Sequence, residues 1–271
     1  MFASTVTRLQ FIYGLLGALV LAFIVLPLFG VVWMSFFAGK ILVFPPRGYT
    51  LDWYARAFAA NDFREGFIVS FQTSFLAMVI SLVLGIPASL ALVRYEFRGR
   101  DVMMNILMSP MIVPGIVGGS ALFIFFLEIE MRTGVQIAGT AAGLIIAHAL
   151  IALPWTVRLV TTSLIGMNRS VEEAACSLGA SSFTVFRRIT LPIIKPGIIA
   201  GALFSFVVSF IDLEKSIFLV GPGKTTLQIA LINYLEWNLD STIGAVATVQ
   251  IVLITALLLI TDKYAKLSRA F

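Results

Sequence analysis

The chain has 271 residues, of which 59% are hydrophobic and 12% are charged, with one histidine, one cysteine and a formal net charge of +5. A water-soluble domain usually contains about 45–50% apolar and about 25% charged residues, so this composition indicates a protein whose main solvent is lipid. One cysteine excludes an internal disulfide, and with a single histidine it leaves little basis for a metal site or a Ser-His-Asp triad. The basic residues lie in short segments between apolar runs, unlike those of a nucleic-acid-binding face.

Six apolar segments are long enough to cross a bilayer, because a spanning helix needs about 20 mostly apolar residues. The first exceeds the apolar core of about 7–15 residues in a signal peptide and is not followed by an A-x-A cleavage site, so we expect it to be retained. The sequence predicts an all-α membrane protein in which one transmembrane domain covers 1–271, with an N-terminal helix and a helical core over 67–261. The six predicted helices are 11–36, 67–93, 102–127, 136–157, 197–220 and 242–261.

Several predicted spans contain proline, which removes a backbone donor and tends to kink a helix. The third span contains Ser109-Pro110-Met111-Ile112-Val113-Pro114-Gly115, with two prolines and a glycine in seven residues. Membrane proteins tolerate such interruptions where neighbouring helices or water satisfy the freed carbonyl groups. Pro110 and Pro114 therefore indicate either a packing kink or a broken helix that lines a transport pathway. Further kinks are predicted at Pro27, Pro87 and Pro154.

The spans divide the basic residues unequally, and such residues concentrate on the cytoplasmic side of a membrane protein. Twelve lie in the two terminal segments and in the loops after the second and fourth spans: Arg8, Arg94, Arg98, Arg100, Arg158, Arg169, Arg187, Arg188, Lys195, Lys263, Lys266 and Arg269. Six lie in the alternate loops: Lys40, Arg47, Arg56, Arg64, Arg132 and Lys224. This asymmetry predicts that both termini are cytoplasmic.

The longest predicted cytoplasmic loop, residues 158–195, has the pattern of two short helices joined by a turn. Glu172 and Glu173 lie in the first turn of the first helix, where acids suit the helix dipole. Gly179 can adopt a positive φ and end this helix, and Ser181 or Ser182 can cap the second. Such a loop can dock into a groove of a partner protein or lie on the lipid surface.

The loop resembles the EAA loop found in permease subunits of bacterial type I ABC importers. That signature reads E-A-A, three residues, G, nine residues and I-x-L-P, and the chain matches it with Glu173-Ala174-Ala175, Gly179, Ile189 and Leu191-Pro192. We expect the second short helix to end at Leu191-Pro192. The resemblance implies a MetI-like transmembrane domain whose EAA loop docks into a separate ATP-hydrolysing subunit. The coupling residues that it implies are Glu172, Glu173, Ala174, Ala175, Gly179, Arg187 and Arg188.

Other segments are similar to polyamine-type permeases of this family, in particular to the second permease of spermidine/putrescine importers. They are residues 94–100, Met108-Ser109-Pro110, residues 178–181, Ser205-Phe206 and Gly221-Pro222. The resemblance implies a multi-pass subunit of the bacterial inner membrane that forms a heterodimer with a second homologous permease. It also implies two ATP-binding subunits and a periplasmic solute-binding protein. ATP and Mg would bind to the partner ATPase, with no cofactor, metal or catalytic site on this chain and no nucleic-acid partner.

Three ionisable residues, Asp212, Glu214 and Lys215, lie in the fifth predicted span, where charged groups are costly and are functional candidates. Asp212 and Lys215 would share one helix face, so Asp212 either forms a structural ion pair or attracts a cationic solute in the pathway. Polyamine-type permeases carry two adjacent acids here. In this chain the first position is Ile211, which leaves room for an amino-acid-like, opine or phosphonate solute. His148 is either hydrogen-bonded between helices or a pathway residue.

A secondary transporter that uses no ATPase is the alternative function. Such a protein would have inverted repeats and ion sites near the membrane midplane. It would leave the loop signature unexplained.

Overall fold

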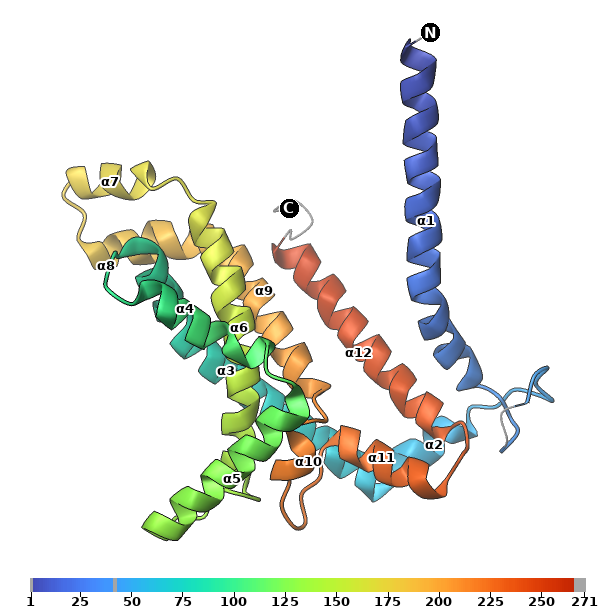
Figure 1. Ribbon diagram of the computed structural model, residues 1–271. Helices are drawn as coiled ribbons and strands as arrows, with labels where there is room; N and C mark the ends of the chain where they lie inside the picture. Colours follow the sequence, from blue (N-terminus) through green and yellow to red (C-terminus); the bar gives the residue numbers. More distant parts are fainter. Residues whose placement is uncertain (1, 41–42, 266–271) are drawn as a thin grey trace. The chain divides into compact units, whose positions relative to one another are not determined.

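The computed structural model describes residues 2–40 and 43–265, and the regular elements within them are helices (Figure 1). The strand-like pairing among these residues is one isolated antiparallel bridge between Phe37 and Tyr49. The chain divides into two compact units. The first consists of Met1–Asn61 with Asn233–Val252, and the second of Asp62–Ile232 with Leu253–Phe271.

The first unit contains a long apolar helix, α1 (Phe2–Met34), and a short helix, α2 (Asp52–Ala59). Large apolar side chains along α1, among them Leu19 and Phe23, are exposed, which suits a helix that faces lipid. The segment after α1 is held by a hydrogen bond of 2.7 Å from the Trp53 indole N–H to the carbonyl of Phe37. The end of α11 (Leu227–Trp237) and the start of α12 (Thr242–Ala265) complete this unit.

The second unit holds the predicted helical core and the loop with the EAA signature. Its remaining elements are α3 (Asn61–Arg94), α4 (Arg100–Met108), η1 (Ser109–Met111), α5 (Gly115–Thr133), α6 (Ala141–Ile165), α7 (Ser170–Ser177), α8 (Ser182–Val185), η2 (Phe186–Thr190), α9 (Leu191–Phe210) and α10 (Ser216–Leu219). The helices α6 and α9 lie side by side and form the main contact of the unit (Figure 1).

Small and hydroxyl side chains let the helices α3, α6 and α9 approach closely, which is how membrane helices usually pack. A Cβ atom at Gly201 would lie 3.2 Å from the Cα of Thr156, so α9 touches the backbone of α6 there. The hydroxyl of Thr156 lies 2.5 Å from that of Ser81 and 2.9 Å from that of Ser205. This buried triad joins one residue from each helix.

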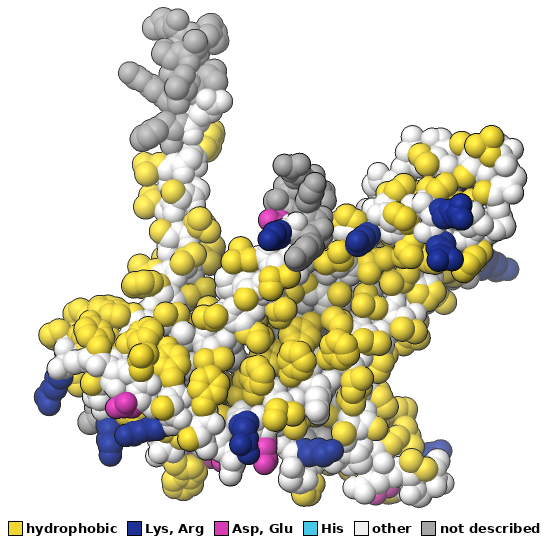
Figure 2. Space-filling view, turned by 180° about the vertical axis from the view of Figure 1, so that it is seen from behind, with side chains coloured by type: hydrophobic (Ala, Val, Ile, Leu, Met, Phe, Trp, Pro, Cys, Tyr) yellow, Lys and Arg dark blue, Asp and Glu magenta, His cyan; other side chains and the backbone are white. Residues whose placement is uncertain are grey.

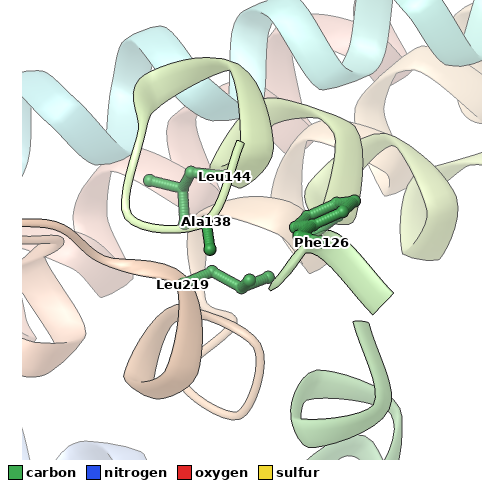
Figure 3. Packing of buried hydrophobic residues seen from close by; sticks show 5 residues of the cluster. Phe126, Ala138, Leu144 and Leu219 are labelled. Atoms are coloured by element: carbon green, nitrogen blue, oxygen red, sulfur yellow. The ribbon is translucent and has the colours of Figure 1, made fainter. Parts of the chain in front are cut away.

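An apolar cluster packs α5 against α6 and α10 (Figure 3). The cluster joins Phe126 of α5, Leu144 of α6 and Leu219 of α10 with Ala138 from the α5–α6 connection, which lies between Leu144 and Leu219 in Figure 3. The burial of Leu219 fixes the short helix α10 next to the end of α9. This cluster therefore positions the irregular segment between α9 and α10.

The apolar helices confirm the prediction of an all-α membrane protein. Within the described residues, five helices are long and apolar enough to cross a membrane, and a sixth span arises if a bent pair counts as one. Hydrophobic side chains predominate on the face drawn in Figure 2. The bent pair consists of Arg100–Met111 and Gly115–Thr133, with a bend of 105° between them. The predicted interruption at Pro110 and Pro114 is therefore a real break. In contrast, Pro27, Pro87 and Pro154 lie inside continuous helices, so no helix ends at them.

Two predicted helix ends are wrong, the one at Leu191-Pro192 and the one at residue 220. The helix does not stop at Leu191-Pro192, because α8, η2 and α9 form one continuous run from Ser182 to Phe210. A π-helical turn lies at this point, and the Leu191 N–H donates to the carbonyl of Phe186, five residues earlier. A wider turn of this kind accommodates Pro192, whose ring would clash with a carbonyl in a regular α-helix. The predicted end at residue 220 is ten residues late, because α9 ends at Phe210.

Candidate functional site

The chain between α9 and α10 is not helical, and the side chain of Asp212 explains why. Its Oδ2 accepts a hydrogen bond of 2.9 Å from the backbone N–H of Lys215. Aspartate competes in this way with the backbone bonds of a helix. Residues 211–215 consequently form a turn directly after the apolar run Ser182–Phe210. Irregular backbone at membrane depth is tolerated where it is buried in protein or lines a cavity.

Asp212, Glu214 and Lys215 form one charged cluster on this turn. The Lys215 Nζ lies 3.4 Å from Asp212 Oδ1 and 3.7 Å from Glu214 Oε2. The Lys215 and Asp212 side chains are only 11% and 8% exposed, whereas that of Glu214 is 51% exposed. A regular helix would point Asp212 and Glu214, two residues apart, in different directions, and the turn removes that restriction.

A pocket of about 480 Å³ opens beside the cluster. Helix α6 contributes Ile151 and Trp155, and the bend between α4 and α5 contributes Pro110 and Met111. The rest of its lining is Val208, Ile211, Asp212, Leu213, Glu214 and Lys215. Its volume is that of a site for a small organic molecule. The pocket thus lies where the break between α4 and α5 meets the turn between α9 and α10.

The N-terminus of α5 comes close to the same cluster. A Cβ atom at Gly115 would overlap the Glu214 carboxylate, and one at Gly119 would lie 2.7 Å from the Glu214 carbonyl oxygen. Only glycines at these two positions allow this approach. The first amide groups of a helix carry partial positive charge, so α5 favours an acid at this point. Pro114, which begins α5 as its N-cap, is not part of the pocket lining.

His148 joins the two ends of the broken helix and does not line the pocket. Its Nδ1 lies 2.9 Å from the hydroxyl of Ser209 in α9, and its Nε2 lies 3.1 Å from the hydroxyl of Ser216 in α10. Ser216 in turn donates to the carbonyl of Asp212 at 2.9 Å. The structure therefore favours the first of the two interpretations of His148, a residue hydrogen-bonded between helices.

Sequence reasoning missed the part that α6 plays in this site. Ile151 and Trp155 lie three and seven residues after His148, so all three belong to one stripe of α6. This spacing from His148 was the signal in the sequence from which the two pocket residues of α6 could have been predicted. Met111 was also missed, although it lies between the two prolines that mark the break.

The EAA loop has the predicted form of two short helices around a turn. Gly179 has a φ of +85°, and the Ser181 hydroxyl caps α8 by accepting from the Thr184 N–H at 3.3 Å. Exposed side chains form its outer surface: Glu173, Ala174, Leu178, Phe183, Arg187 and Arg188. Ala175 is half-buried. Glu172 points inward instead, where its Oε2 lies 3.0 Å from Arg94 Nη2.

Apolar spanning helices, two helix breaks at a common pocket and an exposed two-helix loop define the membrane-embedded subunit of a transporter. Residues 81–266 match the family described as the binding-protein-dependent transport system inner membrane component. Because the match covers more than half of the chain, the protein belongs to this family. It is thus a permease subunit of a binding-protein-dependent ABC importer, in which separate subunits hydrolyse ATP. This membership removes the secondary transporter as an alternative.

Its relatives include polyamine permeases. The chain is 29% identical over 216 residues to the spermidine/putrescine transport system permease protein PotC of Haemophilus influenzae, covering 80% of this chain and 82% of that protein. It is 30% identical over 227 residues to the putrescine transport system permease protein PotI of Escherichia coli K12, covering 83% and 80%. Among solved structures, a bacterial ABC transporter involved in alginate import matches 93% of this chain and 96% of that chain, with a TM-score of 0.70 and 20% identity.

Proposed function

We propose that this subunit conducts a small organic cation of the polyamine type through the membrane, past the pocket at the break in α9. The observation that carries the proposal is the half-exposed carboxylate of Glu214 in a pocket that the aromatic side chain of Trp155 also lines. Both groups attract organic cations, the first by charge and the second through the face of its ring. The names of the relatives PotC and PotI support the same solute class.

The charges of the cluster favour a cation. Two carboxylates and one ammonium group leave one formal negative charge, and Lys215 is closer to the buried Asp212 than to Glu214. A cation about 4 Å from a carboxylate gains about 4 kcal/mol near a protein surface, before water and salt reduce the attraction. Glu214 is therefore the acid that we assign to the solute, with Asp212 as a residue of the pathway wall.

We infer that the coupling surface is the outer face of the EAA loop. Glu173, Gly179 and the pair Arg187 and Arg188 would dock into the ATPase, with Leu178 and Phe183 as apolar contacts. Both are large side chains with most of their surface exposed, and apolar anchors of this kind suit a groove in a partner. ATP and Mg would bind only to the ATPase.

The assembly would contain this chain, a second homologous but different permease, two ATP-binding subunits and a periplasmic solute-binding protein. A binding protein is part of the family's description. The complex would lie in the bacterial inner membrane with both termini of this chain in the cytoplasm, as the distribution of its basic residues favours.

Uptake by the reconstituted complex tests the solute assignment. Radiolabelled putrescine and spermidine should be taken up in an ATP-dependent manner, and glutamate should not compete. Glu214→Gln should reduce polyamine uptake about tenfold, corresponding to about 1.4 kcal/mol, while the complex still assembles. Glu65→Gln, which removes an exposed acid at the start of α3, is the matched control and should retain normal uptake. Normal polyamine uptake in Glu214→Gln would refute the assignment.

A solute with both charges is the second candidate, and Lys215 is the observation that favours it, because its ammonium group lies at the same pocket. An amino-acid-like or opine solute could place its carboxylate near Lys215 and its cationic group near Glu214. Competition separates the candidates: arginine would block uptake of a zwitterionic solute, whereas a polyamine would be blocked by cations without a carboxylate.

A further inference from the structure

The coupling helix α7 is attached to the rest of its unit in an unusual way. None of its eight residues is buried, so apolar packing does not hold it in place. It is joined to the neighbouring helices by two short connections, residues 166–169 and 178–181, and each contains a glycine. Movement of such a helix could be absorbed by these connections before it reached the spanning helices.

The side chain of Glu172 connects α7 directly to neighbouring helices. Glu172 Oε2 lies 3.0 Å from Nη2 of Arg94, the last residue of α3, and Glu172 Oε1 accepts a hydrogen bond of 2.5 Å from the hydroxyl of Thr190. Thr190 ends the π-helical turn that runs directly into α9. The side chains of Glu172 and Arg94 are only 16% and 15% exposed, and Thr190 is 3% exposed. Within the described residues, the ion pairs and side-chain hydrogen bonds that connect α7 with these helices all involve Glu172.

We propose that Glu172 is a positioning residue that ties α7 to α3 and α9, so that movement of the docked loop is passed to the pathway. This inference rests on the proposed ATPase docking, and it assigns Glu172 a different role from that of its neighbour. Glu173 is two-thirds exposed, and its carboxylate pairs with Arg169 within the same segment. Glu173 therefore faces the partner, whereas Glu172 faces the membrane helices.

The chemistry of the contact suits this role. Hydrogen bonds between ionised groups are short and directional, and they strengthen where water is largely excluded. Arg94 also lies at the C-terminus of α3, where the helix dipole favours a cation. Its Nη2 contacts the sulfur of Met167 at 3.7 Å, which helps to orient the guanidinium group. A carboxylate held by two helices can transmit a displacement that an exposed ion pair would not.

A labelling experiment on the whole complex tests whether Glu172 couples α7 to α3 and α9, and it does not require the solute to be known. A maleimide probe is applied to Ile211→Cys in a Cys176→Ser background, because Ile211 lies at the end of α9 and is half-exposed in the pocket. With its binding protein and ATPase present, addition of ATP and vanadate should change the labelling rate of the otherwise unmodified complex at least about fivefold. Glu172→Gln should reduce that change to less than about twofold. Co-purification of the ATPase and its basal ATP hydrolysis should be retained.

Control variants make the outcome specific. Glu96→Gln removes an exposed acid two residues from Arg94 and should keep the full ATP-dependent change. The charge swap Glu172→Arg with Arg94→Glu should restore part of the ATP-dependent change in labelling rate. If Glu172→Gln does not fold, the charge swap provides the test instead. A full ATP-dependent change in the labelling rate of Glu172→Gln would show that Glu172 does not couple α7 to α3 and α9. So would loss of the ATPase from this variant, since Glu172 would then be a docking residue. If the complex with native Glu172 shows no response to ATP, the proposed ATPase coupling itself fails.

Discussion

Asp212 and Glu214 are two residues apart, but their carboxylates have different surroundings. The Asp212 carboxylate is nearly buried, pairs with Lys215 and accepts from the backbone N–H of the same residue. That of Glu214 is half-exposed and lies next to the N-terminus of α5. Burial and pairing indicate that Asp212 maintains the turn, whereas exposure leaves Glu214 free to meet a solute.

Asp212→Asn should consequently impair folding more than Glu214→Gln does. Breaking a buried ion pair by removing one partner costs about 3–5 kcal/mol, because the other charge stays buried. The double variant Asp212→Asn with Lys215→Met should recover most of this loss, since no buried charge is then left unpaired and the Glu214 carboxylate that loses Lys215 is half-exposed. Thermal unfolding of the purified complex and its yield from membranes measure the effect. Equal stability of Asp212→Asn and the unmodified protein would contradict a structural pair.

Uptake by the double variant then separates the two roles of Asp212. Normal polyamine uptake would remove Asp212 from the solute pathway and leave Glu214 as the selecting acid. Uptake that stays low despite normal folding would return Asp212 to the pathway. The sequence alone could not decide this, because the pairing depends on a turn that apolar content and periodicity do not reveal.

At the scale of the elements, local sequence predicts local structure well. The EAA loop was predicted from Gly179 and from the capping serines, and both features depend on interactions within a few residues of each other. The interruption at Pro110 and Pro114 was recognised for the same reason, although the sequence left a packing kink and a broken helix as alternatives. The end of α9 was not predicted, because it depends on the Asp212 side chain and on two serines that bind His148, which lies 61 and 68 residues away from them in the sequence. The π-helical turn was missed as well, since a tertiary hydrogen bond from Thr190 to Glu172 accompanies it.

The loop turn offers a prediction with a closely matched control. Gly179 has a φ of +85°, Gly99 in the loop between α3 and α4 has a φ of +89°, and a Cβ atom at either position would meet no neighbour within 4 Å. Valine therefore introduces similar backbone strain at both sites, of at least about 1–2 kcal/mol. Gly179→Val should abolish uptake and substrate-stimulated ATP hydrolysis while membrane insertion persists. Gly99→Val should insert equally well and retain most of its uptake.

The comparison also defines how the docking proposal would fail. If Gly179→Val transports and hydrolyses ATP as the unmodified complex does, the loop is not the coupling surface. If both valine variants lose uptake to the same extent, strain in any cytoplasmic turn is sufficient, and the special role of Gly179 is lost.

At the scale of the whole chain, the apolar helices determine that the protein crosses the membrane, but not in which direction. Composition and apolar length predicted six spans, and the part of the chain that the structure describes contains five helices long and apolar enough to span plus one bent pair. Direction depends on the basic residues, which are twice as frequent in one set of connecting segments as in the other. The loop between α1 and α2 and the EAA loop belong to opposite sets, so their exposure to the two sides of the membrane tests the orientation.

Cysteine labelling of intact cells should therefore distinguish these two loops. In a Cys176→Ser background, Gly48→Cys should react with a membrane-impermeant maleimide added from outside, and Ser182→Cys should react only after permeabilisation. Both substitutions suit the local structure: a Cβ at Gly48 would lie at an ordinary 3.6 Å from the Cβ of Ala38, and Ser182 is exposed and follows the residue that caps α8. Labelling of Ser182→Cys but not of Gly48→Cys in intact cells would invert the topology. It would also move the EAA loop away from the ATP of the cytoplasm, and the proposed coupling to an ATPase could not operate.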